Sequence, residues 1–353
     1  MVKKFQKIGL LVLMGTFLLM ASCEYPFFDI SPLHKVRSTR VSGLYNFEFS
    51  ADRSKVVGAI CTEPITYSTF FGVGSTCASS ALSFMDLSTL SENERSSDFD
   101  GIVFSFAASP DGRTFVAAGC ADVDIECEPF PLFPLLFICN PVYSGGRITI
   151  WDSQTCELET TKLVSAPVKA AAFSNDGRLF TAVLSTGHLL VWETQTWNLM
   201  EDIILGERRE SMKIQFTPDD EQVIVSCGSL LVLDTRTWHR VKVLKVDARD
   251  FEIDPSNELL IVATFDGISV YDMNTWELID TPQEATDIED ITLSSDGLFL
   301  AVLRDHGVTI WRTELWEPID GIDGDFKTIK FLRNTEMLGC LSHGNELSLW
   351  SLD

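Results

Sequence analysis

A unit of about forty residues, repeated six times in the C-terminal two thirds, constrains the fold of this chain more than any other feature. Each copy contains alternating apolar residues, then a bulky residue, then usually an acid, as in GRITIWD at 146–152 and GVTIWR at 307–312. Such alternation is typical of β-strands, and repeats of this length built from short strands are typical of propeller blades. The bulky residues are Trp151, Trp192, Leu233, Tyr271, Trp311 and Trp350, spaced by 41, 41, 38, 40 and 39 residues.

Each unit can be divided into four strands. In one copy, VKAAAF at 168–173 is an inner strand, LFTAVL at 179–184 the second strand and LLVWE at 189–193 the third. The turn at 174–178 contains Asp-Gly, which supplies the backbone conformation of a tight hairpin. We expect Trp197, which follows the third strand, to open the outer strand.

These repeats resemble WD-repeat β-propellers over roughly residues 40–353. The Gly-His pair that opens many such repeats is missing, and the closing Trp-Asp is intact only at Trp151-Asp152, so the family's hydrogen-bond network is not carried over. Counting backward identifies two degenerate blades, one ending near 82–86 and one at Trp151, and together with the other five anchor residues they give seven blades in total. An aromatic residue at one fixed position per blade favours packing between sheets over a ladder that stacks sugars or bases.

The last unit ends with its third strand, ELSLWS at 346–351. We expect residues 34–41, which precede the first inner strand, to supply the missing outer strand, because closure removes an exposed edge. The sequence therefore predicts an all-β fold: a single seven-bladed β-propeller at 34–353, closed by the N-terminal strand.

Residues 1–22 have the order of an export signal, with three lysines, an apolar run at 8–20 and small residues before Cys23. A spanning helix needs about 20 apolar residues, so this shorter run favours a cleaved signal. The segment 19–23 resembles the lipobox of bacterial lipoproteins, which implies lipidation at Cys23 followed by a linker at 23–33. Glu24, in place of the aspartate that retains enterobacterial lipoproteins in the inner membrane, favours the outer membrane. We therefore expect a cell-envelope protein that a lipid holds at the membrane.

The chain is strongly acidic, with 51 Asp and Glu against 27 Lys and Arg and a net charge of −24. A surface of this sign repels nucleic acid and anionic headgroups, which argues against both as partners. No other apolar run reaches spanning length, since prolines interrupt the stretch at 130–137. We expect contact with the membrane through the anchor alone, and a monomer.

The chain contains eight cysteines after Cys23, and an even number in an exported protein allows disulfides. Two pairs flank expanded loops at equivalent places in the first two repeats, and two further cysteines end inner strands. We therefore expect disulfides Cys61–Cys77 and Cys120–Cys139, and buried free thiols at Cys227 and Cys340.

The first two blades differ from the rest because the connection between their second and third strands is expanded, at 62–80 and at 121–146. Both should rise at the same end of the channel. Prolines in the second insertion favour an extended, stiff segment over a helix. Long loops in compact domains are usually functional or disordered, and these carry many large apolar groups.

We expect these apolar groups either to fold onto the propeller or one another, or to form a docking surface for an envelope protein or a lipid-like ligand. The docking interpretation names partner-binding residues Phe70, Phe71, Phe130, Leu132, Phe133, Leu135, Leu136 and Phe137.

His188, His306 and His343 each precede a third strand beside a glycine, which favours turn positions over a metal or acid–base site. Two acidic clusters could contribute calcium ligands, but neither matches a full calcium-loop template, so solvated acids are the simpler interpretation. We expect no cofactor other than possible calcium, whose candidate ligands are Asp122, Asp124, Asp320, Asp323 and Asp325.

The sequence therefore favours a non-catalytic interaction platform for envelope proteins. The alternatives are a metal-dependent propeller hydrolase or lactonase, and a binder of a hydrophobic small ligand. No nucleophile elbow, P-loop or dinucleotide fingerprint supports an enzyme, and no catalytic residue is predicted.

Overall fold

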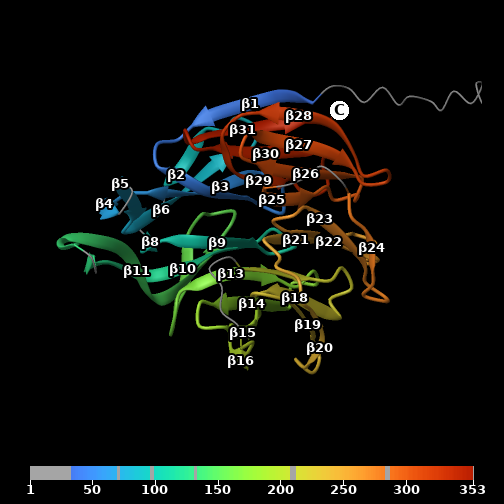
Figure 1. Ribbon diagram of the computed structural model, residues 1–353, viewed down its shortest axis with the longest axis horizontal. Helices are drawn as coiled ribbons and strands as arrows, with labels where there is room; N and C mark the ends of the chain where they lie inside the picture. The colour runs from blue at the N-terminus through green and yellow to red at the C-terminus, as the bar shows by residue number, and fades with distance from the viewer. Residues whose placement is uncertain are drawn as a thin grey trace, which may run out of the picture.

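The computed structural model of the protein is a ring of seven β-sheet blades around a central channel (Figure 1). In Figure 1, β9, β13, β21 and β25 lie toward the middle of the ring, and β16, β20, β24 and β1 lie at its rim. The structure describes residues 33–69, 72–95, 99–130, 133–206, 212–282 and 287–352.

Within blades 1 to 6, the strands run outward in chain order, whereas the outer strand of blade 7 is β1. Blade 1 contains β2 (Leu44–Phe49), β3 (Lys55–Cys61), β6 (Ser79–Asp86) and β7 (Glu92–Arg95), with β8 (Phe99–Asp100) also pairing β6; blade 2 contains β9 (Val103–Ala108), β10 (Thr114–Phe130), β11 (Phe133–Asp152) and β12 (Leu158–Val164). Blade 3 contains β13 (Val168–Phe173), β14 (Leu179–Leu184), β15 (His188–Glu193) and β16 (Leu199–Ile204); blade 4 contains β17 (Lys213–Phe216), β18 (Gln222–Ser226), β19 (Leu230–Asp234) and β20 (Arg240–Leu244). Blade 5 contains β21 (Asp250–Ile253), β22 (Leu259–Ala263), β23 (Ile268–Asp272) and β24 (Leu278–Asp280); blade 6 contains β25 (Ile288–Leu293), β26 (Phe299–Arg304), β27 (Gly307–Arg312) and β28 (Glu317–Asp323). Blade 7 contains β29 (Phe326–Phe331), β30 (Met337–Ser342), β31 (Glu346–Ser351) and β1 (His34–Arg40).

The predicted closure is confirmed, because β1 is the outer strand of blade 7. It pairs antiparallel with β31, from His34 opposite Ser351 to Arg40 opposite Glu346. The Lys35 ammonium lies 2.6 Å from the Glu346 carboxylate across this pair. The N-terminal strand thus covers an edge that β31 would otherwise expose.

The core lies between neighbouring blades, where the aromatic repeat positions pack. The ring centroid of Trp151 lies 5.9 Å from that of Phe84 in blade 1, and Trp192 of blade 3 belongs to one buried cluster with Ile148 and Ile150 of blade 2. Trp151, Trp192 and Trp311 are each at most 4% exposed. These side chains stabilise the stacking of sheets, which excludes a stacking ladder for ligands at those three positions.

The second tryptophan of the repeat lies in a turn, so the prediction that Trp197 opens the outer strand is wrong. The backbone N–H of Trp197 donates to the Glu193 carbonyl at 2.7 Å, and Trp197 has φ 55°. In blade 4 the Asp234 carboxylate accepts from the N–H groups of Arg236 and Thr237, which caps the same turn. The acid at the end of the third strand is therefore a turn-capping residue.

Both expanded connections form β-hairpins rather than irregular loops. The first contains β4 (Pro64–Thr69) and β5 (Gly72–Cys77), which form a separate two-stranded sheet. The second is a continuation of β10 and β11 beyond the blade, and we call residues 121–145 the arm. Figure 1 shows the arm extending away from the ring on the side of β4 and β5.

None of the described residues belongs to a helix that is long and apolar enough to cross a membrane. The signal peptide at 1–22, Cys23 and the linker up to residue 32 lie outside the described residues, so their expected roles stay predictions.

Candidate interaction face and central channel

The arm rises at the end of the channel where the inner strands begin. Val103, the first residue of β9, pairs with Gly119, where β10 leaves the blade. A Cβ at Gly119 would collide with the Ile102 carbonyl oxygen, and a Cβ at Gly146 would collide with the Ala166 carbonyl oxygen. Glycine at both positions therefore allows the two strands to pass between neighbouring backbones. We call this end of the ring, with the arm and the β4–β5 hairpin, the insertion face.

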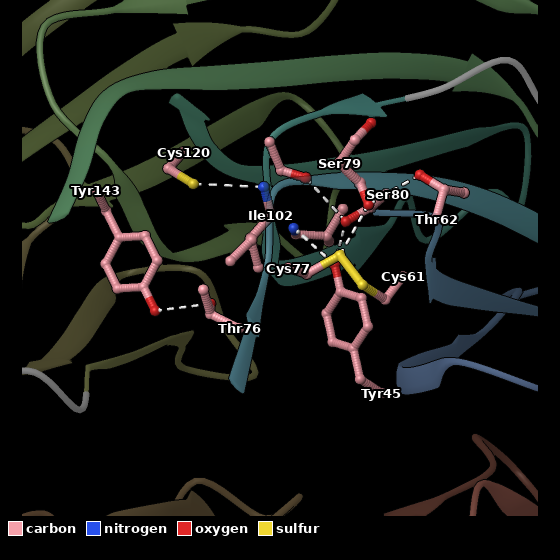
Figure 2. The surroundings of a disulfide bond; sticks show 12 residues. Tyr45, Cys61, Thr62, Thr76, Cys77, Ser79, Ser80, Ile102, Cys120 and Tyr143 are labelled. Carbon is pink, nitrogen blue, oxygen red and sulfur yellow. Dashed lines mark hydrogen bonds between the residues drawn. A yellow bond between two sulfur atoms is a disulfide. The ribbon is translucent and has the colours of Figure 1, made fainter. Parts of the chain in front are cut away.

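The base of the β4–β5 hairpin is closed by a disulfide between Cys61 and Cys77, the predicted pair (Figure 2). Beside it, the N–H of Thr62 donates to the Ser79 carbonyl at 2.9 Å. The hydroxyls of Tyr45 and Ser80 lie 2.7 Å apart near this disulfide (Figure 2). Burial raises the pKa of Tyr45 to about 12, so this phenol is a neutral structural group.

The arm has a disulfide of its own, but between different partners from those predicted. Cys139 bonds to Cys127, not to Cys120. The register explains the difference, because Cys127 lies directly opposite Cys139, whereas Cys120 lies opposite Gly146. Seven residues of strand, about 23 Å, separate that position from Cys139.

Cys120 is a buried free thiol at the base of the arm. Its sulfur accepts from the N–H of Ile102 at 3.3 Å, as Figure 2 shows. Burial raises the pKa of this thiol, which keeps it protonated. Cys227 and Cys340 are also buried and form no disulfide within the described part of the chain, as predicted.

The arm and the β4–β5 hairpin are fixed to each other and to blade 3. The Tyr143 hydroxyl of the arm lies 3.2 Å from the Thr76 hydroxyl of β5. The Tyr143 ring meets Phe104 edge to face at 5.4 Å, and the Lys169 ammonium lies 4.4 Å from the Phe104 ring centroid. Val123 packs into the same apolar cluster as the Cys61–Cys77 disulfide. The two insertions therefore form one supported structure rather than two independent loops.

The predicted apolar docking residues belong to the two insertions of the sequence. Phe70, Phe71 and Leu132 fall outside the described residues. The remaining five have backbone in β10 or β11, and their side chains are outside the description, so their role stays a prediction; they are Phe130, Phe133, Leu135, Leu136 and Phe137.

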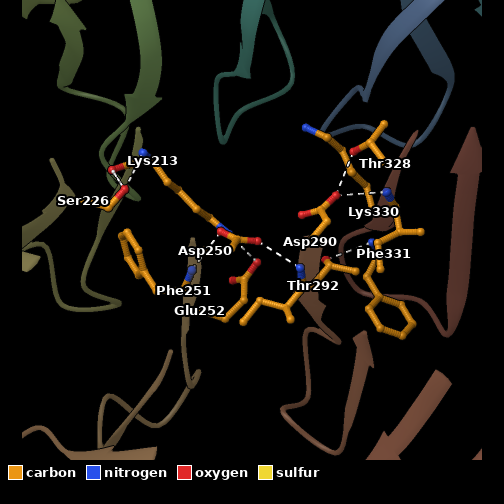
Figure 3. Close-up of polar contacts among 12 residues, drawn as sticks. Lys213, Ser226, Asp250, Phe251, Glu252, Asp290, Thr292, Thr328, Lys330 and Phe331 are labelled. Atoms are coloured by element: carbon orange, nitrogen blue, oxygen red, sulfur yellow. Dashed lines mark hydrogen bonds and ion pairs between the residues drawn. The ribbon is translucent and has the colours of Figure 1, made fainter. Parts of the chain in front are cut away.

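A polar channel of about 900 Å³ runs between the seven inner strands. A set of ion pairs lines the channel on blades 4 and 5 (Figure 3). The Lys213 ammonium lies 2.8 Å from the Asp250 carboxylate and 3.0 Å from that of Glu252. Burial opposes the charged form of Lys213, but the two carboxylates outweigh it and raise the pKa of Lys213. Burial raises the pKa of Glu252, against the opposing effect of Lys213.

Side chains of this network also bond the backbone of the next blade. Asp250 accepts from the N–H of Ile291 at 2.9 Å, and Asp290 accepts from the N–H of Ile329 at 3.1 Å (Figure 3). Burial, with the neighbouring Asp250 carboxylate, raises the pKa of Asp290 to about 7. The Lys330 ammonium lies 2.6 Å from the Glu48 carboxylate, which connects blade 7 to blade 1. We call Lys213, Asp250, Glu252 and Asp290 the channel network; its contacts are those of a structural link between blades 4 to 7.

Sequence reasoning did not find the channel network. A signal was available, because the inner strands KIQF, DFEI and IEDITL carry charged residues where a fully buried strand would be apolar. The ring geometry that brings these strands within hydrogen-bonding distance depends on all seven blades, and no local pattern reports it.

The histidine and calcium candidates do not converge. The His188 ring lies 2.7 Å from Asp202, and the His343 ring lies 3.7 Å from Asp325 in another blade. The calcium candidates fall in two separate places: Asp122 and Asp124 on the arm, and Asp320, Asp323 and Asp325 in and after β28. Within the described part of the chain, no group of three or more His, Cys, Asp or Glu side chains is arranged to hold a metal ion.

The fold and repeat place the chain in the structural class of seven-bladed β-propellers. A similar solved structure is the β-propeller domain of Cps50 (Swd1) from Myceliophteria thermophila, with a TM-score of 0.65 and 14% sequence identity. That likeness covers 91% of this chain and 99% of the other, and at this identity it shows the fold alone. No protein-family model matches the chain, and no curated protein matches it.

Proposed function

We propose that this protein is a non-catalytic interaction platform of the cell envelope, held at the membrane by a lipid on Cys23, with the outer membrane favoured. Its partner is an envelope protein that binds the insertion face. A rigid propeller whose loops carry the binding surface is a common arrangement, because the ring positions loops that are free to vary.

This proposal rests mainly on the observation that disulfides and a side-chain contact hold the two insertions in place. Each has its own disulfide, Cys61–Cys77 and Cys127–Cys139, and the Tyr143–Thr76 contact connects them. Insertions that served only to cover the ring would not need a ribbon that continues past the blade. At about 3.3 Å per residue, the ten residues from Ala121 to Phe130 extend about 30 Å. A held, extended structure loses little entropy on binding.

The test is affinity capture from detergent-solubilised envelopes. The full-length protein is compared with a variant whose residues 128–138 are replaced by a short Gly/Ser linker. A matched control, L199S/M200S/I204S, removes exposed apolar side chains from the outer strand of blade 3 instead. We expect one partner to be captured by the native protein and the control and lost from the arm variant. Equal capture by all three proteins, each melting at the native temperature, would contradict the proposal.

A further inference from the structure

The arm has two faces of opposite chemistry. Residues directly opposite in an antiparallel pair point to the same side, and successive residues alternate. Val123 faces with Tyr143, and both are half-buried toward the β4–β5 hairpin. The other face carries exposed carboxylates at every second position of β10, which are Asp122, Asp124, Glu126 and Glu128. We call these four residues the acidic row.

The carboxylates of the acidic row form no ion pairs within the described part of the ring. Among the described residues, no lysine, arginine or histidine forms an ion pair with any of the four carboxylates. The side chains across from them on β11, at Ser144, Val142 and Asn140, are exposed and uncharged. The row therefore presents unneutralised charge over about 20 Å of strand.

The strand that carries the acidic row also has a free edge. Within the blade, β10 pairs with β9 on one side and β11 on the other. The pairing with β9 stops at Gly119, and in the described part of the chain no strand continues it alongside the arm. The edge of β10 next to Asp122–Glu128 thus offers backbone N–H and C=O groups to an added strand.

We propose that the arm binds a basic extended segment of the partner, which adds as a strand to the free edge of β10 and places lysine or arginine at every second residue beside the acidic row. The charge of the acidic row and the spacing of its carboxylates indicate the chemistry of the bound segment. Acids about 7 Å apart on one face match cations at alternate positions of a neighbouring strand, because both strands have the same repeat. This inference rests on the proposed function and names the chemistry of its partner.

The test uses two synthetic peptides of one composition. In the first, lysine alternates with threonine; in the second, all lysines form one block. Binding to the full-length protein is measured by fluorescence anisotropy at low and physiological salt. We expect the alternating peptide to bind about tenfold more tightly than the block peptide, and to lose affinity as salt rises. Amide exchange at 121–128 should slow only with the alternating peptide. Equal affinity of the two peptides would overturn the proposal.

Two variants with the same change in net charge distinguish binding at the acidic row from nonspecific electrostatic attraction of the peptide to an acidic protein. D122N/D124N/E126Q/E128Q neutralises the acidic row, and E159Q/E201Q/E277Q/E317Q neutralises four exposed acids on outer strands and the turns before them. We expect the first to weaken the alternating peptide about tenfold and the second to change it less than about twofold. Equal weakening by both variants would contradict a specific site.

The capture experiment distinguishes failure here from failure of the proposed function. If replacing 128–138 releases the envelope partner while neutralising the acidic row does not, the platform stands and the basic-strand inference fails. If neither change releases the partner, the proposed function fails with it.

Discussion

In the channel, the carboxylates of Asp250 and Glu252 share the Lys213 ammonium, whereas the four carboxylates of the acidic row on the arm are exposed and form no ion pair with any residue that the structure describes. Both sets lie on strands of the same propeller, and both are acidic. Asp250 and Asp290 also accept backbone hydrogen bonds from the next blade, so their polarity is used inside the fold. Charge that the fold satisfies contributes to stability, and charge that it leaves exposed is available for binding.

The largest expected effect comes from removing Asp250. The Asp250→Ala variant leaves the Lys213 ammonium with one fewer carboxylate and the Ile291 N–H without its acceptor. We expect the free energy of unfolding to fall by about 3 kcal/mol. Urea denaturation measures it, with Asp122→Ala on the arm as the control, expected to change stability by less than about 0.5 kcal/mol. Equal losses at both positions would remove the distinction between the two sets.

A pH series sharpens the comparison. The folded pKa of Asp290 is about 7, above its ordinary value of 3.8, so the folded state binds more protons than the unfolded state between these values. Its contribution is therefore present at low pH and is lost as pH rises from about 4 to 7. Asp290→Asn, which keeps a polar side chain facing Asp250 and Thr328, should remove this loss. Its advantage over the native protein in free energy of unfolding should therefore be about 4 kcal/mol larger at pH 8 than at pH 4.

Denaturation of native protein and Asp290→Asn at several pH values checks this prediction. Asp124→Asn on the arm is the matched control, because it replaces an exposed carboxylate by the same amide. A pH-independent difference for Asp290→Asn would show that the channel carboxylates are not coupled to folding.

A smaller effect is expected where the arm meets its neighbour. Tyr143→Phe removes the hydroxyl that lies 3.2 Å from Thr76 and keeps the ring against Phe104. One partly buried hydrogen bond contributes about 1 kcal/mol. Amide exchange should become faster in β4–β5 while the blades are unchanged, and Thr76→Val should have the same effect. An equal change in the amides of blades 4 to 6 would show that the insertions are part of one cooperative unit with the ring.

The smallest effect is a difference in reactivity between cysteines, which thiol labelling should reveal because buried thiols react slowly. Cys120, Cys227 and Cys340 are buried, so native protein should not react with iodoacetamide at these positions. Mild reduction should expose Cys127 of the arm first, because its side chain is exposed. Mass spectrometry of the labelled peptides gives the order. Labelling of Cys120 before Cys127 would contradict the burial at the base of the arm.

The ring could be predicted from the sequence because its signal is repeated. Six anchor residues with nearly constant spacing indicate the blades. The last repeat lacks an outer strand, and the segment HKVRSTRV at 34–41 belongs to no other blade, which indicates the closure. The β1–β31 pairing follows from that count of strands. Because the same pattern recurs, the assignment of strands in one blade can be checked against the other blades.

The parts that were missed depend on register or on distant blades. Cys120 and Cys139 flank the insertion in the sequence, but the hairpin register places Cys127 opposite Cys139. Trp197 follows a strand in the pattern, yet the capped turn before β16 fixes it in a left-handed conformation. Neither the pairing register of a hairpin nor the hydrogen bonds of a turn can be read from the spacing of apolar residues.

The most direct test of the interaction platform is site-specific photo-crosslinking in intact envelopes. A photoreactive residue is placed at Val142, exposed on the arm, and in a second protein at Ile204, 70% exposed on the outer strand of blade 3. Both proteins must melt at the native temperature. We predict that a partner protein is crosslinked through position 142 and not through position 204. Crosslinking through 204 alone, or through neither position, would contradict binding at the insertion face.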